Sequence, residues 1–261
     1  MTLYVGLINL DRCPDRLAAA SRQIADAGLV AERIAAVDGA QLTPADLAKY
    51  DQDRARQKYR RCVSQGEIGC YLSHIETLGR FLASGADHAL VFEDDATFGP
   101  ELGPLVGQLA EALGPRKDWD VVNLGNSTRR SYSRSMRIVA DGGGHLLCRA
   151  HHFPSLTTAL FWSRGGAAAF LACALPVIAP IDQTLKDWCI RTDRGLAFTV
   201  APVRSGRSAS VIDALAGNAG RGERLPGYFV TKQKRHVVNW LTSLQHRLRH
   251  LSGKGPQDHR G

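Results

Sequence analysis

The chain has 261 residues, of which 44% are hydrophobic and 22% are charged, enough apolar material for one large domain or two small ones. This composition excludes a mainly disordered chain, and the 26 Gly and 11 Pro follow no collagen-like period. Residues 221–261 hold nine Lys or Arg against two acids, so they carry +7 of the net charge of +8. The nearly neutral remainder excludes nucleic acid as a partner of the body.

Hydrophobic patterning predicts strands and helices that alternate along the chain. An apolar run at 3–10 predicts the first strand, and helical spacing follows at 17–29. Further strands are expected at 31–37, 88–92, 119–124, 157–162 and 196–201. Further helices are expected from Thr43 and at 64–82, 102–113, 165–174 and 183–191, and a polar loop is expected at 125–145. Such alternation predicts an α/β domain with a mostly parallel sheet, which we expect over residues 1–220.

The cysteines and the N-terminus bear on the compartment. The six cysteines are scattered, with no CxxC pair and no spacing suited to zinc, which predicts reduced thiols. The first ten residues lack a basic region and are too short for a signal peptide, and no run of 18 apolar residues occurs. We therefore expect a cytoplasmic protein.

Three consecutive acids close the strand expected at 88–92. Glu93, Asp94 and Asp95 repel one another, and partial burial adds to the cost of their charges. A divalent cation removes that cost, and carboxylate oxygens are the ligands that Mg²⁺ or Mn²⁺ prefer. The alternative is a solvated turn in which Asp95 or Thr97 caps the next helix.

Charged residues also follow the first strand, where open α/β sheets bind their ligands. Arg12 and Arg16 could form forked hydrogen bonds to a diphosphate, and Asp11 could accept one from a ribose or base. The alternative is helix-start chemistry, because Asp is favoured near a helix N-terminus by the helix dipole alone.

The helix expected at 64–82 begins with a capping box, Ser64-Gln65-Gly66-Glu67. Glu67 and His74 are seven residues apart and therefore share one helix face. Gly66 and Gly69 would let a ligand approach the backbone closely. A lone His on a helix is more often structural, which is the alternative for His74.

Taken together, four motifs in order resemble glycosyltransferase family 25. They are Ile8-Asn9-Leu10-Asp11-Arg12 with Arg16, Val37-Asp38-Gly39, Glu67-Ile68-Gly69-Cys70-Tyr71-Leu72-Ser73-His74 and Leu90-Val91-Phe92-Glu93-Asp94-Asp95. That family includes bacterial lipopolysaccharide and lipooligosaccharide β-galactosyltransferases and collagen galactosyltransferase domains. The clear resemblance covers about residues 3–98, and a looser one reaches Ala201-Pro202.

The resemblance implies a GT-A-like (Rossmann-like) nucleotide-sugar fold and an inverting transfer of a hexose, galactose before glucose, from a UDP-sugar. It implies that Asp94 and Asp95 hold Mn²⁺ or Mg²⁺ on the diphosphate, with Glu93 or Asp94 near the ribose. The other residues that it assigns to the nucleotide or the substrate are Asp11, Arg12, Arg16, Asp38, Gly39, Glu67, Ser73 and His74.

Inversion needs a carboxylate that deprotonates the acceptor hydroxyl. We assign Asp182 to this role or to a contact with the donor sugar, with Asp187 as the second choice; as a plain alternative, Asp182 could be a helix N-cap. The implied acceptor is a cell-envelope saccharide. Two segments depart from the family pattern, Ala159-Leu160-Phe161-Trp162-Ser163 and Val203-Arg204-Ser205-Gly206-Arg207, and both lie in the half expected to bind the acceptor.

The basic C-terminal segment, 221–251, has amphipathic spacing. Val237, Val238, Leu241, Leu244, Leu248 and Leu251 recur at helical intervals beside Trp240, with cations flanking them. Such a helix suits an anionic membrane surface, so we expect peripheral binding to the inner membrane. The alternative is a terminal helix packed on the domain. Residues 252–261 are expected to be disordered.

Two other functions fit the same residues. The first is a metal-dependent nucleotidyltransferase or nucleotide-sugar hydrolase that uses the same acids. The second is a non-catalytic membrane-surface protein on a degenerate transferase fold. The products separate the enzymes, because a nucleotidyltransferase releases pyrophosphate and a glycosyltransferase releases UDP.

Overall fold

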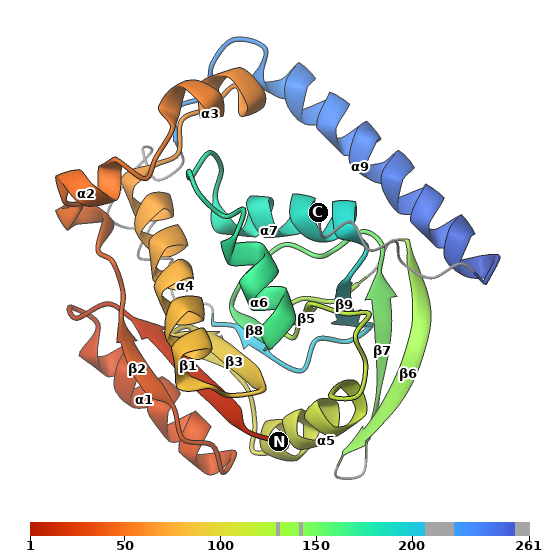
Figure 1. Cartoon of the computed structure of the whole chain (residues 1–261). Helices are drawn as coiled ribbons and strands as arrows, with labels where there is room; N and C mark the ends of the chain where they lie inside the picture. Colours follow the sequence, from red (N-terminus) through yellow and green to blue (C-terminus); the bar gives the residue numbers. More distant parts are fainter. Residues whose placement is uncertain (129–130, 141–142, 207–221, 254–261) are drawn as a thin grey trace.

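A central sheet organises the fold in the computed structural model, which describes residues 1–128, 131–140, 143–206 and 222–253. Its strand order is β2-β1-β3-β8-β5-β9-β7-β6 (Figure 1). The strands are β1 (Leu3–Asn9), β2 (Glu32–Ala35), β3 (His88–Glu93), β5 (Val121–Asn123), β6 (Tyr132–Ala140), β7 (Gly143–Ala150), β8 (Ala159–Ser163) and β9 (Gly195–Phe198). A second, two-stranded sheet pairs β4 (Ala96–Thr97) with β10 (Arg204–Ser205).

The strand directions bear out the mostly parallel sheet. β1 is parallel to β2 and β3, and β5 is parallel to β9. β8 is antiparallel to both of its neighbours, and so is β7. The other six strands of this sheet therefore point the same way, with β8 and β7 reversed among them.

The predicted polar loop at 125–145 is wrong over most of its length. Residues 132–140 and 143–150 form a β-hairpin, β6 and β7, at the sheet edge. Ile138 and Leu147 are buried, and β6 packs against α5 (Leu102–Leu113). The pairing register shifts between Arg134 and Met136, and this bulge interrupts the alternation by which a strand is recognised.

Helices cover both faces of the sheet, giving three layers. α4 (Gln65–Ser84), α6 (Arg164–Leu171) and α7 (Ile181–Thr192) share one apolar core with the sheet, and α1 (Pro14–Asp26) and α5 share the other. The remaining helices are η1 (Gly39–Gln41), α2 (Pro44–Leu47), α3 (Gln52–Tyr59) and α9 (Tyr228–Leu251). None of the helices in the described residues has the length and apolar character needed to cross a membrane.

The capping box predicted for α4 is confirmed. The Ser64 hydroxyl accepts a hydrogen bond from the Glu67 N–H at 3.3 Å, and the Glu67 carboxylate accepts one from the Ser64 N–H at 2.9 Å. The helix ends at Gly85, whose φ of 78° lies in the left-handed region that glycine adopts at low cost. The capping box fixes where α4 starts, and therefore which of its residues face the sheet.

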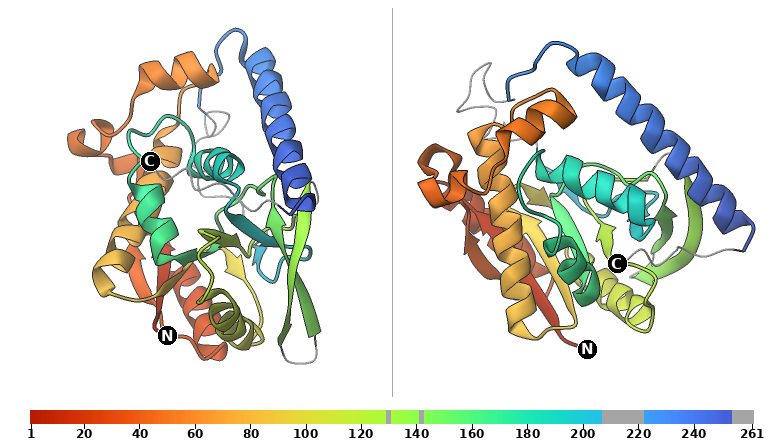
Figure 2. Two further views of the ribbon diagram at one scale, coloured as in Figure 1. Left: turned by 45° about the vertical axis from the view of Figure 1, so that its right-hand side comes forward. Right: turned by 45° about the horizontal axis from the view of Figure 1, so that its top comes forward.

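Helix α9 runs along the outside of the molecule and packs against α3, α7 and β6 (Figures 1 and 2). It occupies residues 228–251 of the segment predicted at 221–251. The predicted domain boundary at 220/221 and residues 254–261 of the predicted disordered tail lie outside the described residues. All six cysteines are free thiols.

Two histidines of α9 face the body of the protein, His246 beside Asp193 and His250 beside His151. Burial lowers the pKa of His246 and of His250. The unfolded chain, with ordinary histidines of pKa about 6.5, therefore takes up protons first as the pH falls. The stability contributed by these groups is present above pH ~6.5 and is lost below it. The charged groups that influence them are Asp118, Arg149, His151, Asp193 and Arg249.

We expect the amides of α9 to exchange hydrogen faster, relative to those of α4, at pH 5.5 than at pH 7.5. Exchange measured by mass spectrometry after correction for intrinsic rates tests this. The double variant His246→Gln, His250→Gln is the control and should lose most of the pH dependence. An unchanged dependence in that variant would contradict the assignment.

Candidate functional site

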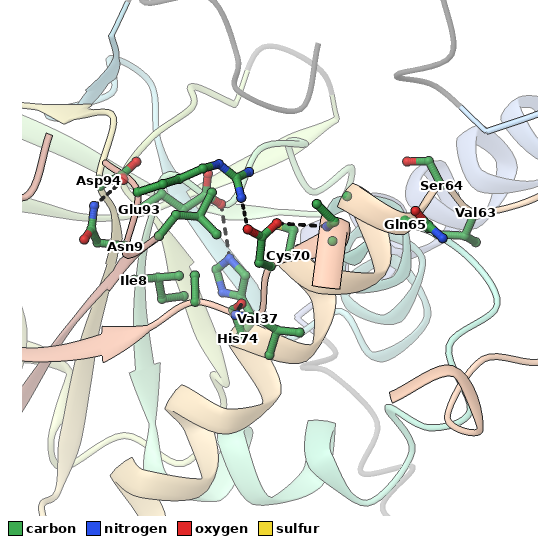
Figure 3. A pocket seen from close by; sticks show the side chains of 18 of the residues that line it. Ile8, Asn9, Val37, Val63, Ser64, Gln65, Cys70, His74, Glu93 and Asp94 are labelled. Carbon is green, nitrogen blue, oxygen red and sulfur yellow. Dashed lines mark hydrogen bonds and ion pairs between the residues drawn. The ribbon is translucent and has the colours of Figure 1, made fainter. Parts of the chain in front are cut away.

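A cavity of about 590 Å³ opens at the carboxyl ends of β1 and β3. From β1 the chain continues to β2 on one side, and β3 pairs on the other side, so this is the topological switch point where α/β sheets bind ligands. The N-terminal part of α4 and the 36–40 loop form a second wall, and Gly222 and Glu223 complete the lining (Figure 3). Residues from five separate parts of the sequence therefore meet here.

The three acids lie together on this cavity, each with different partners. Asp94 accepts a hydrogen bond from the Asn9 amide at 2.7 Å and forms an ion pair with Arg16 at 3.2 Å. The Glu93 carboxylate lies 3.1 Å from His74 Nε2 (Figure 3). It also accepts a hydrogen bond from the Thr157 hydroxyl at 2.5 Å.

Asp95 is the least satisfied of the three. One of its oxygens accepts a hydrogen bond from the Ser205 hydroxyl at 2.7 Å. The other oxygen, Oδ1, is buried and has no hydrogen-bond partner among the described residues. A buried acceptor without a partner carries a desolvation cost, so Asp95 has the capacity for one more electropositive group.

The pKa values of the three acids are shifted in different directions. Burial raises the pKa of Asp94, and burial together with the charge of Glu93 raises that of Asp95. Burial also acts to raise the pKa of Glu93, but hydrogen bonds with His74 and Thr157 outweigh it and hold that pKa below its usual value. The protein itself therefore stabilises the charged form of Glu93. The charged forms of Asp94 and Asp95 would be stabilised by an added cation.

Two guanidinium groups line the cavity beside the acids. Arg16 pairs with Asp94, and Arg12 pairs with Asp38. Asp38 also accepts a hydrogen bond from the Ala40 N–H at 2.9 Å, which caps η1 and fixes the loop. The cavity thus presents fixed positive and negative groups side by side, a surface suited to a polar anion accompanied by a cation.

The close contact between α4 and the 36–40 loop requires glycine at two positions. A Cβ on Gly69 would overlap the Val37 carbonyl, and one on Gly39 would overlap the backbone of Gly66. The Ser73 hydroxyl joins the same two segments, donating to the Gly69 carbonyl at 2.7 Å and accepting from the Val37 N–H at 2.9 Å. The expectation that Gly69 makes room for a ligand is therefore wrong, because protein backbone fills that space.

The predicted residues that line the cavity are Arg12, Arg16, Asp38, Gly39, Ser73, His74, Glu93, Asp94 and Asp95. Three others do not. Asp11 pairs with Arg33, and its side chain is 81% exposed. The carboxylate of Glu67 is taken by the capping box and by Arg61, at 2.7 Å.

Asp182 is the third predicted residue outside the lining. It lies in the first turn of α7, and burial, with the charges of Glu67 and Glu93, raises its pKa. Of these two acids, Glu93 lines the cavity, so Asp182 lies close to one of the cavity's carboxylates. Asp187, the second choice, lies in a separate groove and accepts hydrogen bonds from Tyr59 (3.2 Å), Gln183 (2.7 Å) and Asn239 (2.9 Å).

Sequence analysis assigned no role to several residues that complete the site. Asn9 lies in the first motif but offers no charge, and Thr157 and Ser205 come from the distant half of the chain. Cys70, His74 and Glu93 place potential metal ligands within 4.8 Å of one another. Burial and the charge of Glu93 raise the pKa of the Cys70 thiol.

A three-layer α/β fold with a polar, acid-lined cavity at its switch point defines a ligand-binding α/β protein. Residues 2–185 match the sequence model of glycosyltransferase family 25, described as an LPS biosynthesis protein. The chain belongs to glycosyltransferase family 25.

Similar proteins are found in animals. A glycosyltransferase 25 family member of Aedes aegypti is 32% identical over 126 residues, covering 47% of this chain and 21% of that protein. An inactive glycosyltransferase 25 family member 3 of Homo sapiens is 28% identical over 187 residues, covering 69% of this chain and 31% of that protein. A family member of Drosophila melanogaster is 24% identical over 186 residues, covering 69% and 30%. The chain thus spans a fifth to a third of the length of these relatives.

Proposed function

We propose that this protein is an inverting, metal-dependent glycosyltransferase that moves a hexose from a UDP-sugar to a hydroxyl of a saccharide. The observation that carries the proposal is the cavity at the switch point, with acids and guanidinium groups on the same surface. We assign Arg12 and Arg16 to a diphosphate, because a guanidinium fork can hold a phosphate while retaining a carboxylate partner. The position of the cavity also supports a GT-A-like fold.

The residues present fit a divalent cation. Asp95 Oδ1 is buried without a partner in the described part of the chain, and the pKa values of Asp94 and Asp95 are raised by burial. Hard carboxylate oxygens of this kind suit Mn²⁺ or Mg²⁺. Bound there, such an ion would neutralise charge that develops on the departing UDP.

The chain's own groups account for the remaining steps. Glu93, held ionised by His74 and Thr157, can accept a hydrogen bond from a ribose hydroxyl without changing its charge. Asp182, whose pKa is raised, is the proposed base that takes the proton of the acceptor hydroxyl, and a raised pKa makes a carboxylate a stronger base. A single displacement on the sugar then inverts the anomeric configuration.

The finer details rest on the family resemblance. Galactose is the proposed donor sugar, and a lipopolysaccharide-type saccharide of the cell envelope is the proposed acceptor, modified on the cytoplasmic side of the inner membrane. The family's description as an LPS biosynthesis protein supports this acceptor. The departures at 159–163 and 203–207 lie near the site: β8 follows Thr157, and Ser205 contacts Asp95, whereas Arg207 is outside the described residues.

Calorimetric titration with UDP and UDP-galactose, with and without Mn²⁺, tests the proposal on the wild type and on Asp95→Ala. We expect micromolar binding that requires Mn²⁺ in the wild type and a loss of at least tenfold in the variant, about 1.4 kcal/mol. Asp11→Ala is the matched control, since the structure places Asp11 outside the cavity. It should bind like the wild type.

Two outcomes would overturn the proposal. If neither nucleotide binds with Mn²⁺ present, the non-catalytic alternative becomes the better one, in line with the relatives named inactive. If incubation with UDP-galactose and saccharide acceptors releases galactose 1-phosphate instead of UDP, the reaction is nucleotidyl transfer or hydrolysis of the diphosphate. UDP together with a glycosylated product is the result we expect.

A further inference from the structure

Helix α9 packs against the body of the protein through its polar face. Arg235 donates to Gln183 at 2.9 Å, and Asn239 donates to Asp187 at 2.9 Å. Further along, the Ser243 carbonyl accepts a hydrogen bond from the Ser131 hydroxyl at 3.0 Å. These residues recur at intervals of four, so they form one face of the helix, and that face is the one attached to the body.

The opposite face is apolar and points into solvent. Its large side chains are each between 46% and 70% exposed: Phe229, Val230, Val237, Val238, Trp240, Leu241, Leu248 and Leu251. A helix of a water-soluble fold ordinarily buries its apolar stripe and exposes its polar one. In α9 the arrangement is reversed, and a continuous exposed apolar face of this kind marks an interaction surface.

The charge of α9 favours an anionic lipid surface as its partner. Helix α9 contains five Lys or Arg and no Asp or Glu. Lys234 and Arg247 are exposed and, by helical spacing, flank the apolar face on its two sides. A second copy of this chain would bring the same cations against one another, whereas anionic lipid headgroups would neutralise them. Trp240 adds a side chain of the kind that favours the boundary between headgroups and acyl chains.

We propose that α9 seats the protein on an anionic lipid bilayer, with the helix parallel to the surface and its apolar face in the acyl boundary. The segment before α9 joins this surface to the cavity. The Cys62 N–H donates to the Glu223 carbonyl at 2.8 Å, and the Leu225 N–H donates to the Arg60 carbonyl at 2.9 Å. Because Cys62 and Glu223 line the cavity, a protein seated by α9 holds one wall of its cavity close to the start of the membrane-bound helix.

Flotation of the full chain with vesicles tests this inference. We expect binding to phosphatidylcholine vesicles that contain phosphatidylglycerol, weakened by salt, and little binding to phosphatidylcholine alone. The affinity of the triple variant Val237→Gln, Leu241→Gln, Leu248→Gln for these vesicles should be lower by roughly tenfold or more. Val30→Gln is the matched control, because Val30 is 90% exposed and lies outside α9. It should bind like the wild type.

A charge variant separates electrostatic attraction from apolar insertion. Lys234→Glu with Arg247→Glu should abolish the preference for phosphatidylglycerol while leaving the thermal unfolding midpoint unchanged. Undiminished vesicle binding by the triple variant would overturn the inference. The inference would also be overturned if light scattering showed that the wild type is a dimer and the triple variant a monomer, and if the wild type bound no vesicles. Neither result depends on nucleotide binding, so this inference and the proposed transfer reaction can fail separately.

Discussion

Replacing Asp182 by Asn is expected to lower kcat for sugar transfer by roughly 10²- to 10⁴-fold, the usual contribution of a general base. Binding of UDP should change little, since Asp182 does not line the nucleotide cavity. A base must be deprotonated to act, so wild-type activity should fall as the pH falls through the pKa of Asp182. Burial raises that pKa, which places this acidic limb above the ordinary value of 3.8. The pH profile of kcat/KM in the variant should lack the limb.

The matched control is Asp187→Asn, on the same helix. Its carboxylate already accepts hydrogen bonds from Tyr59, Gln183 and Asn239, so this change should loosen the contact between α7 and α9. We expect a loss of about 1–3 kcal/mol in the free energy of unfolding and an unchanged acidic limb. If Asp187→Asn removed the limb and Asp182→Asn kept it, the assignment of the base would be wrong.

Replacing Gly69 by Ala is expected to reduce the free energy of unfolding by about 1–3 kcal/mol, the usual cost of inserting a methyl group into a filled space. The new Cβ would overlap the Val37 carbonyl and press on Gly39, so α4 and the 36–40 loop must separate. Because Asp38 and Gly39 line the cavity, UDP binding should weaken as well. Urea denaturation and calorimetry measure the two effects.

Gly79→Ala on the same helix provides the control. No atom lies within 4 Å of a Cβ built at Gly79, and the residue is exposed in the middle of α4. This variant should gain about 0.5–1 kcal/mol of stability, because Ala loses less conformational entropy than Gly in a helix. A destabilised Gly79→Ala together with a neutral Gly69→Ala would contradict both the entropic gain expected at Gly79 and the close packing assigned to Gly69.

Local patterns predicted the elements that build the cavity. β1, α1, α4 and β3 each have a clear hydrophobic period or capping sequence, and each lies close to where it was expected. The observed helix α5, Leu102–Leu113, matches its predicted bounds. Such elements depend on interactions between residues a few positions apart, which is the information that a single sequence displays.

The failures have a different origin. The β6–β7 hairpin is rich in Arg and Ser and contains a bulge, so its strands lack a clean hydrophobic period. Asp11 is adjacent to Arg12 in the motif, yet the pairing of β1 with β2 brings it to Arg33 instead. Thr157 and Ser205 contact the acids only because β8 lies beside β3 and β10 beside β4. Contacts of this range are set by topology, which the spacing of motifs does not encode.

The position of β9 in the sheet limits how far the protein can be truncated from its C-terminal side. The match to the family ends at residue 185, inside α7, whereas β9 at Gly195–Phe198 lies between β5 and β7 in the sheet. A fragment that stopped at the family boundary would leave the β6–β7 hairpin without the strand that joins it to the sheet. It would also leave Asp95 without Ser205. The shortest autonomous folding unit is therefore longer than the stretch by which the family is recognised.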